Sequence, residues 1–364
     1  MKIKNILALV CFLCIGVSCS MEDDILNDVD TKGSDTNIAD TEAVFSISLS
    51  GNGPMTKAGE KEDPNIDTST EASISNCFVA IIEGENVLSS YWFETADLQA
   101  SSESFTTEIK RHMIVKVPSK NPPTLSAYAV ANLSAETASR LLACKTLNGI
   151  KNVELADPPT LLVKVGGQPI GAYKTTSQLA THDDANCNKV TIPVSQRAAA
   201  FELAFFKVVD ASKEKVNGQY PEVKNVEVVS VQMLNIKQGA KVVGEYGDSF
   251  LDMTDIRKPS DVNPMDPDKA PYGTYDKIRF YGYDNTDANT LTSMKITYKV
   301  DGGAEMERTY PIKIDGVGAA GVEGGKLYKL NVTIGYASEE IRFVIDDWIL
   351  NTLEVGDIYG EPVM

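Results

Sequence analysis

The sequence predicts an all-β protein built mainly from antiparallel sheets. Apolar and polar residues alternate with a period of two in most of its hydrophobic segments, which is typical of strands with one buried and one solvated face. Clusters of Gly, Pro, Asn and Asp separate these segments. Only Ala135 to Cys144 has a clear helical pattern, with Ser134 as its N-cap. Because strands and helices do not alternate, antiparallel β-sandwiches with one or two short helices are expected.

The first residues form a secretory signal. A charged start, Met1 to Lys4, precedes an apolar run from Ile6 to Val17, which is too short to cross about 30 Å of hydrocarbon as a helix. Gly16 to Cys19 resembles a lipobox, although Gly16 stands where Leu is usual. We therefore expect residues 1–18 to be removed and Cys19 to carry a lipid; ordinary secretion is the alternative.

Residues 19–43 are expected to form a tether between the lipid and the folded body. The segment is polar, acidic and nearly free of aromatic residues, so it cannot bury enough apolar surface to offset the loss of chain entropy. Glu22, Asp23 and Asp24 resemble the export signal that sends lipoproteins to the outer surface of some Gram-negative anaerobes. We therefore expect the precursor on the outer membrane.

The remaining chain is long enough for two domains, each with its own core. A boundary is expected near Gln196, where the strand Lys189 to Val194 ends and the apolar run Ala198 to Val209 begins. The predicted domains are residues 44–196 and 197–364.

The alternation also places individual strands. In the first one, Val44 to Leu49, apolar residues alternate with serines, so one face fits a core and the other fits water. The same pattern predicts strands at Cys77 to Ile82, Met113 to Val117, Met294 to Val300 and Tyr328 to Ile334.

Composition argues against several classes of function. The chain has 51 Asp and Glu residues against 34 Lys and Arg residues, so its net field repels phosphate and nucleic-acid binding is not expected. Beyond the signal and Cys19, only Cys77, Cys144 and Cys187 remain. Three cysteines do not make a disulfide framework, and their spacing fits no zinc site.

No catalytic residues, cofactor or metal site are expected. The only histidines are His112, before a predicted strand, and His182, in a polar loop, and neither belongs to a recognisable triad. Gly316 to Gly321 matches a dinucleotide fingerprint in its letters but leads into a strand. Asp261 to Asp268 offers oxygen ligands like a calcium loop, but Met265 and two prolines interrupt it.

Taken in order, several segments resemble the fimbrillin family, the subunits of type V pili of Gram-negative anaerobes. The series begins with Cys19, the acidic tether, the first strand and the loop Gly51 to Gly59. Ile192 to Leu203 resembles the interdomain junction of the family, and Gly325 to Val332 with Phe343 to Trp348 resembles its closing strands. No one segment is specific, but their order is.

The resemblance implies two transthyretin-like β-sandwiches of Greek-key type and a structural role in a fimbrium that supports adhesion. Such subunits arrive as lipidated precursors and are cut by an Arg- or Lys-specific protease after the first strand. Loss of that strand opens an apolar groove, which a segment of another subunit fills by strand addition.

For this chain, the resemblance implies a cut between Lys57 and Ala58, with Lys61 as a second candidate. It also implies a donor strand within residues 349–364. The side chains concerned are Phe45, Ile47 and Leu49 of the displaced strand and Leu353 and Val355 of the donor.

Three alternatives stay open. The first strand could be an ordinary edge strand of a permanently closed sandwich. The chain could be a surface glycan-binding lipoprotein of a nutrient-uptake system, which predicts a cluster of exposed aromatic residues; Trp92 and Trp348 instead lie in strand-like runs that suit a core. A hydrolase would need a carboxylate pair, and carboxylates are too abundant here for their spacing to exclude one.

Overall fold

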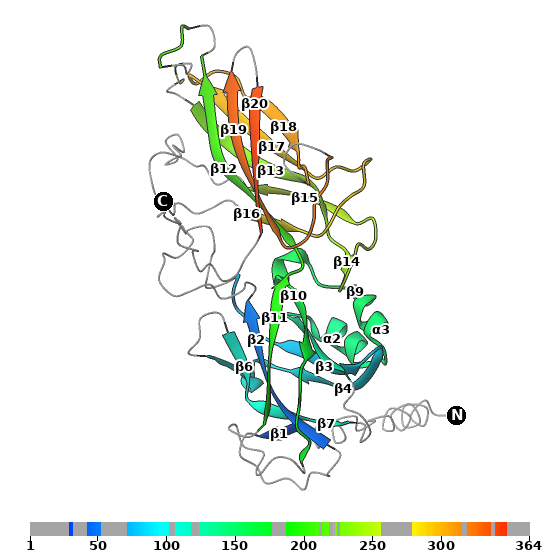
Figure 1. Ribbon diagram of the computed structural model, residues 1–364. Helices are drawn as coiled ribbons and strands as arrows, with labels where there is room; N and C mark the ends of the chain where they lie inside the picture. The colour runs from blue at the N-terminus through cyan, green and yellow to red at the C-terminus, as the bar shows by residue number, and fades with distance from the viewer. Residues whose placement is uncertain are drawn as a thin grey trace, which may run out of the picture.

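The protein is almost entirely β (Figure 1), and the prediction of an all-β fold is confirmed. Two α-helices, α2 (Ala135–Leu142) and α3 (Leu147–Lys151), occur among the described residues. The structure is a computed structural model that describes residues 29–31, 42–51, 71–101, 106–117, 124–176, 187–210, 213–217, 221, 223, 226–255, 279–314, 319–335 and 339–347.

The first half forms a ten-stranded sheet with the main order β1-β7-β2-β11-β10-β8-β3-β4, and β6 and β5 attach beside β2. β10 and β11 pair at only two positions, so the sheet splits there into two parts whose side chains share one core. The strands are β1 (Val29–Thr31), β2 (Glu42–Gly51), β3 (Cys77–Glu83), β4 (Asn86–Phe93), β5 (Leu98–Ala100), β6 (Thr106–Ile109), β7 (Arg111–Lys116), β8 (Leu125–Ala131), β10 (Lys164–Ile170) and β11 (Asn188–Gln196).

The second half contains two four-stranded sheets, ordered β16-β12-β19-β20 and β15-β13-β17-β18 (Figure 1). A second hydrophobic core includes residues from both sheets. Their strands are β12 (Ala199–Val209), β13 (Val226–Lys237), β15 (Phe250–Asp255), β16 (Arg279–Gly282), β17 (Ser293–Val300), β18 (Met306–Pro311), β19 (Lys326–Gly335) and β20 (Glu339–Asp347).

Two strand pairs are parallel within these largely antiparallel sheets. β2 runs parallel to β11, and β12 runs parallel to β19. In each half the first long strand therefore meets a strand from near the end of that half. Alternation along a strand specifies its buried face but not the direction of its neighbour, so the sequence could not show this.

The helix α2 starts where the sequence predicts. The hydroxyl of Ser134 accepts a hydrogen bond from the backbone N–H of Thr137, which satisfies one of the free donors of the first turn. Thr137, Ala138 and Leu141 form its buried face. The helix ends at Leu142, two residues before the predicted Cys144.

A third hydrophobic cluster joins the two halves, which lie end to end (Figure 1). Two short strands also pair across the junction: β9 (Glu154–Leu155) with β14 (Ala240–Lys241). The predicted boundary near Gln196 lies between the first two cores and stays a prediction. The cluster contains Phe78, Ile82, Leu155 and Val163 from the first half and Ala200, Val242, Tyr283 and Leu327 from the second.

Two local details differ from what the sequence predicts. Val29–Thr31, inside the segment predicted to be a solvated tether, forms β1 and pairs with β7. Strand pairing uses backbone groups, so a polar composition does not prevent it. His112 lies within β7 instead of before it and is buried, because β1 extends the pairing of β7 back to Arg111.

Candidate functional site

The strand predicted to be removable, β2, lies inside the sheet. It pairs antiparallel with β7 through Glu42–Phe45 and with β6 through Ser48–Ser50. On its other side it pairs in parallel with β11 over Phe45–Gly51. Because both of its backbone edges are bonded, β2 is not an edge strand, and a permanently closed sandwich stays the alternative to strand release.

The apolar face of β2 is completely enclosed. Phe45, Ile47 and Leu49 are 0, 1 and 0 % exposed and belong to the core of the first half. The Phe45 ring also lies 6.1 Å from the ring of Tyr173, centre to centre. The alternating serines are half-buried, so the two faces of the strand are those that the sequence predicted.

Two polar contacts fix the register of β2 against β11. The hydroxyls of Ser48 and Thr191 lie 2.9 Å apart, within hydrogen-bonding distance. The side-chain amide of Asn188 donates to the carbonyls of Val44, at 3.0 Å, and Lys174, at 2.8 Å. Its oxygen accepts from the N–H of Lys174 at 2.8 Å. Nothing in the sequence marked Asn188 as the residue that holds the start of this strand.

The neighbours of β2 form a complementary site for an extended segment. β7 and β6 offer backbone groups on one side and β11 offers them on the other. Three buried core residues lie opposite the apolar positions of β2 in the register. They are Met113 opposite Phe45, Val190 opposite Ile47 and Ile192 opposite Leu49. Recognition by strand addition uses these two elements, a backbone ladder and alternating apolar pockets.

The remaining predicted site residues lie outside the described residues. β2 ends at Gly51 and the next described residue is Glu71. The predicted cut therefore lies in the chain that follows β2, and the predicted donor follows β20. The residues concerned are Cys19, Lys57, Ala58, Lys61, Leu353 and Val355.

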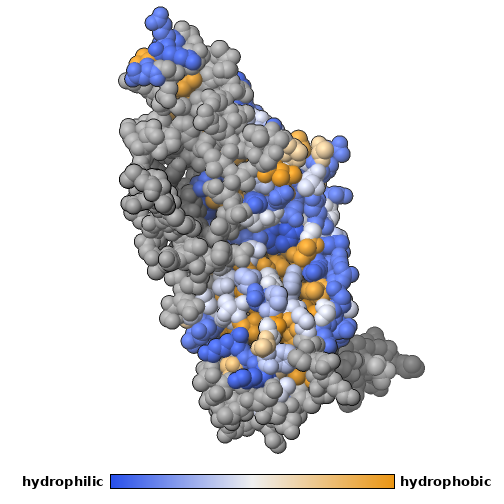
Figure 2. All heavy atoms as spheres, in the orientation of Figure 1, coloured by the Kyte–Doolittle hydropathy of each residue, from blue (hydrophilic) through white to orange (hydrophobic). Residues whose placement is uncertain are grey.

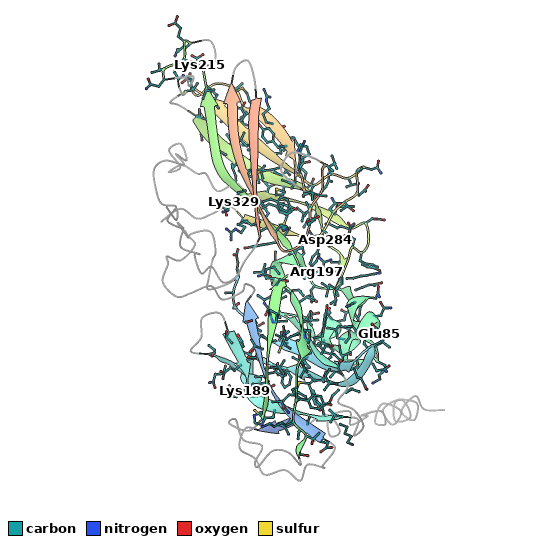
Figure 3. The ribbon with its side chains drawn as sticks, in the orientation of Figure 1. Glu85, Lys189, Arg197, Lys215, Asp284 and Lys329 are labelled. Carbon is teal, nitrogen blue, oxygen red and sulfur yellow. The ribbon has the colours of Figure 1, made fainter. Side chains whose placement is uncertain are left out.

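A polar network surrounds Arg197 at the junction of the halves (Figure 3). Its guanidinium donates to the carbonyls of Lys241 and Gly244 at 3.0 and 2.7 Å and forms an ion pair with Asp284 at 2.8 Å. A Cβ atom on Gly324 would lie 2.3 Å from the Arg197 carbonyl oxygen, so only glycine permits this approach. The sequence pattern predicts a junction near Gln196 but carries no signal for the role of Arg197.

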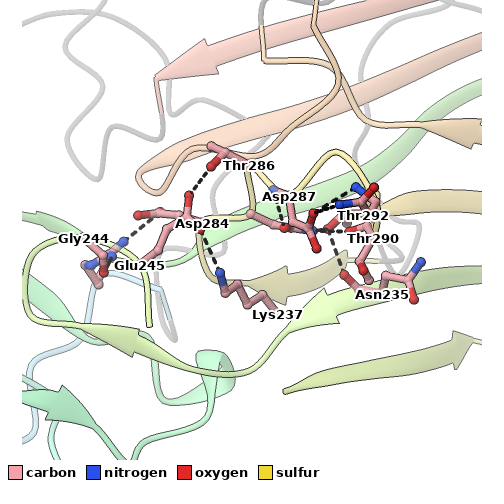
Figure 4. A network of polar contacts seen from close by, with 12 residues as sticks. Asn235, Lys237, Gly244, Glu245, Asp284, Thr286, Asp287, Thr290 and Thr292 are labelled. Atoms are coloured by element: carbon pink, nitrogen blue, oxygen red, sulfur yellow. Dashed lines mark hydrogen bonds and ion pairs between the residues drawn. The ribbon is translucent and has the colours of Figure 1, made fainter. Parts of the chain in front are cut away.

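The network continues into the loop between β16 and β17 (Figure 4). Lys237 contacts the Glu245 carboxylate at 2.8 Å, and the Thr286 hydroxyl donates to it at 2.6 Å. Burial alone raises the pKa of Glu245, but these two partners outweigh it and lower the pKa below its ordinary value. The contacts hold this loop against the junction.

A hollow lies where β10 and β11 separate. It has a volume of about 600 Å³ and a mainly polar lining that includes Gln168, Lys174 and Lys189. Its opening follows from the short pairing of the two strands, which ends at Val165.

The cysteines and some of the other predicted chemistry lie within the described residues. Within the described ranges, no three His, Cys, Asp or Glu side chains gather as metal ligands would. No helix in the described part of the chain is long and apolar enough to span a membrane. The thiols of Cys77, Cys144 and Cys187 are not joined in disulfides, and burial raises the pKa of the Cys77 thiol. His182 and Asp261 to Asp268 lie outside the described residues.

The surface offers little support for a glycan platform. On the face seen in Figure 2, separate hydrophobic spots are interspersed with hydrophilic residues. Trp92 packs against the cluster between the halves. Only one of the exposed large apolar side chains among the described residues is aromatic: the set is Leu161, Val216, Val243, Tyr246 and Leu251.

The fold is shared with proteins of bacterial fimbriae. No family model and no curated protein matches this sequence. Among solved structures, a fimbrial assembly protein from Parabacteroides distasonis has a TM-score of 0.51 at 16% identity, over 84% of this chain and 96% of its own. A candidate cell adhesion protein from Bacteroides eggerthii has a TM-score of 0.52 at 17% identity, over 86% and 98%.

A tip fimbrial protein from Porphyromonas gingivalis, solved with a C-terminal truncation, has a TM-score of 0.50 at 9% identity, over 84% of this chain and 100% of its own. Identities this low show a common fold and do not transfer activities residue by residue. The chain has the fold of these fimbrial and cell adhesion proteins.

Proposed function

We propose that this chain is a structural subunit of a surface fimbrium and polymerises by strand exchange after proteolysis. The position of β2 carries the proposal. The strand is enclosed by β7, β6 and β11, yet one cut in the chain after Gly51 would leave it attached by non-covalent contacts alone. The fold shared with fimbrial proteins supports the same role.

The energetics suit such an exchange. Burial of an apolar side chain of this size contributes about 1.5–3 kcal/mol, and β2 buries three of them in the core. Loss of the strand would expose that core and leave backbone groups unpaired on both sides of the gap. The site would therefore bind a replacement strand, which we assign to Leu353 and Val355 in residues 349–364 of another subunit.

The proposed route from export to assembly has three stages. Residues 1–18 direct export, Cys19 is lipidated, and the precursor is held on the outer membrane by residues 19–43. A Lys- or Arg-specific surface protease then cuts after Lys57 and β2 is released from domain 44–196. The processed chain, which begins at Ala58 and includes domain 197–364, joins the fimbrium and supports adhesion. We expect Cys19→Ala to release the precursor from the membrane fraction in detergent partitioning; unchanged partitioning would contradict lipidation.

The decisive experiment follows the cut and the polymer together. Purified precursor is treated with a Lys-specific protease, its new N-terminus is sequenced, and the products are run without boiling in sodium dodecyl sulfate. We expect a chain that begins at Ala58 and a ladder of polymers. The double substitution Lys57→Ala with Lys61→Ala should abolish both.

A control variant removes one lysine far from the predicted cut. Lys215 is exposed near the far end of the second half (Figure 3), so Lys215→Ala should leave the cut and the ladder unchanged. Polymers formed by the uncut double variant would refute the proposal. So would protein from intact cells whose N-terminus lies before β2.

A further inference from the structure

The described chain resumes at Glu71, and this residue is buried in a cluster of charges that spans the two halves. The Glu71 carboxylate contacts the Arg279 guanidinium at 2.5 Å and accepts a hydrogen bond from the Tyr281 hydroxyl at 2.8 Å. Arg279 also pairs with Glu202 at 2.5 Å. Arg279 and Tyr281 lie on β16 and Glu202 lies on β12, so a residue that precedes β3 is held by the second half.

The cluster is shielded from water. The side chains of Glu71, Arg279 and Glu202 are 1, 6 and 5 % exposed. Burial alone lowers the pKa of Arg279, but the carboxylates of Glu202 and Glu71 outweigh it and raise the pKa above its ordinary value. Removal of one partner from such a buried set leaves another charge uncompensated, which costs far more than the loss of an exposed ion pair.

The residues that follow Glu71 are also held through the backbone. The side-chain amide of Gln196 donates to the Glu71 carbonyl at 2.8 Å. The ammonium of Lys164, which is fully buried, donates to the Ser73 carbonyl at 2.8 Å, and the Asn132 amide donates to the same carbonyl at 3.0 Å. These contacts fix both the backbone and the side chains of this short segment.

Three further hydrogen bonds tie the end of the segment, just before β3, to the two residues that follow β8. The Asn132 side-chain oxygen accepts from the N–H of Ser75 at 2.9 Å. Asn76 exchanges two hydrogen bonds with the backbone of Leu133, at 2.8 and 3.0 Å. All of the partners named here lie on or beside β8, β10, β11, β12 and β16, none of which the proposed processing would remove.

We propose that residues 71–76 limit strand release: after the cut at Lys57 and the loss of β2, loosening of the new N-terminal region stops at Glu71, because the charged cluster of the second half holds this residue. The proposal rests on the proposed function, because it sets how far the structure loosens once processing has released β2. Glu71 acts as a positioning residue, with no part in the cut itself.

The test compares amide hydrogen exchange in residues 71–76 before and after a cut made in vitro with a Lys-specific protease. In the parent protein we expect the cut to leave exchange in this segment unchanged. In Glu71→Gln we expect the cut to accelerate it by about tenfold or more, because the opening of a segment that has lost its anchor is governed by local stability. Each variant is compared with its own uncut form, so a general loss of stability cancels.

Glu202→Gln is the matched control. It removes the other carboxylate from the same guanidinium but leaves the contact between Glu71 and Arg279 intact, so the cut should not accelerate exchange in residues 71–76. Tyr281→Phe removes the hydroxyl that donates a hydrogen bond to Glu71. This variant serves as the test if Glu71→Gln does not fold. For this variant we expect a smaller acceleration of the same sign.

Two results would contradict the proposal that residues 71–76 limit strand release. One is exchange in residues 71–76 that rises to the rate of an unprotected peptide when the parent protein is cut. The other is equal acceleration in Glu71→Gln and Glu202→Gln. Because the cut is made in vitro, failure of the proposed function would show separately, as an unprocessed N-terminus on cells or as absent polymers.

Discussion

Leu49→Ala gives a quantitative test of whether β2 belongs to the precursor alone. Leu49 is fully buried and lies opposite Thr107 of β6 and Ile192 of β11. Truncation of a buried leucine costs about 2–5 kcal/mol, through lost transfer free energy and the cavity left behind. With about 2–4 °C for each kcal/mol in a body of this size, the melting temperature of the precursor should fall by about 4–20 °C.

The assay measures this deficit in two states of the protein. One is the uncut precursor, and the other is the cut protein after addition of a synthetic peptide of residues 349–364. In the second state Leu49 has left with its strand, so the variant and the parent should melt together. Ile192→Ala is the matched control, because β11 stays in place and both states should lose stability.

The same substitution should also shift the equilibrium after the cut towards dissociation of β2. A loss of 2 kcal/mol shifts the release equilibrium by about thirtyfold. Equal deficits in the precursor and in the complemented protein would show that β2 is never displaced. A deficit in the precursor below about 1 kcal/mol would contradict the burial on which the reasoning depends.

Three further expectations concern other parts of the chain. Burial lowers the pKa of Lys164 from 10.5 to about 7, against an opposing effect of Glu71; between these values only the unfolded chain binds the proton, so stability should rise with pH, by up to about 1.4 kcal/mol per unit. Lys164→Met should flatten this rise in urea titrations from pH 7 to 9.5, and an unchanged slope would contradict the shift. Deletion of residues 349–364 should leave a folded, cleavable monomer that cannot extend a polymer; a lower melting temperature with normal assembly would contradict the donor role. Arg197→Lys keeps the charge near Asp284 but cannot reproduce the whole set of donors, so it should cost about 1.5–3 kcal/mol in urea unfolding, and a neutral result would show that the junction does not depend on Arg197.

The sequence predicted what depends on local pattern. Strands with one buried face show it as alternation, so β2 and the orientation of Phe45, Ile47 and Leu49 could be predicted, as could the capped start of α2. The neighbours of β2 could not be predicted, because alternation does not specify a partner. The parallel pairing with β11 joins segments more than a hundred residues apart, as the Ser48–Thr191 contact shows.

The buried charges could not be predicted for a related reason. Glu71 and Arg279 are 208 residues apart, and in a sequence each looks like a surface residue. Lys164 lies between Val163 and Val165 in an alternating run, where the pattern predicts a solvated side chain, yet it is fully buried. Glu71 and Arg279 compensate each other's charge, and Lys164 donates to the distant Ser73 carbonyl. Single-sequence patterns carry no information about such long-range partners.

The kinds of interaction on either side of the proposed cut explain why one segment would be exchangeable and the other would not. β2 is held mainly by apolar burial and a backbone ladder, and neither requires a particular sequence beyond apolar residues at alternate positions. Another subunit can therefore supply an equivalent strand. Glu71 is held by a buried guanidinium and a hydroxyl, which require a carboxylate at one position. A foreign strand would not satisfy Arg279, so strand exchange in this fold should end where the apolar contacts give way to the charged ones.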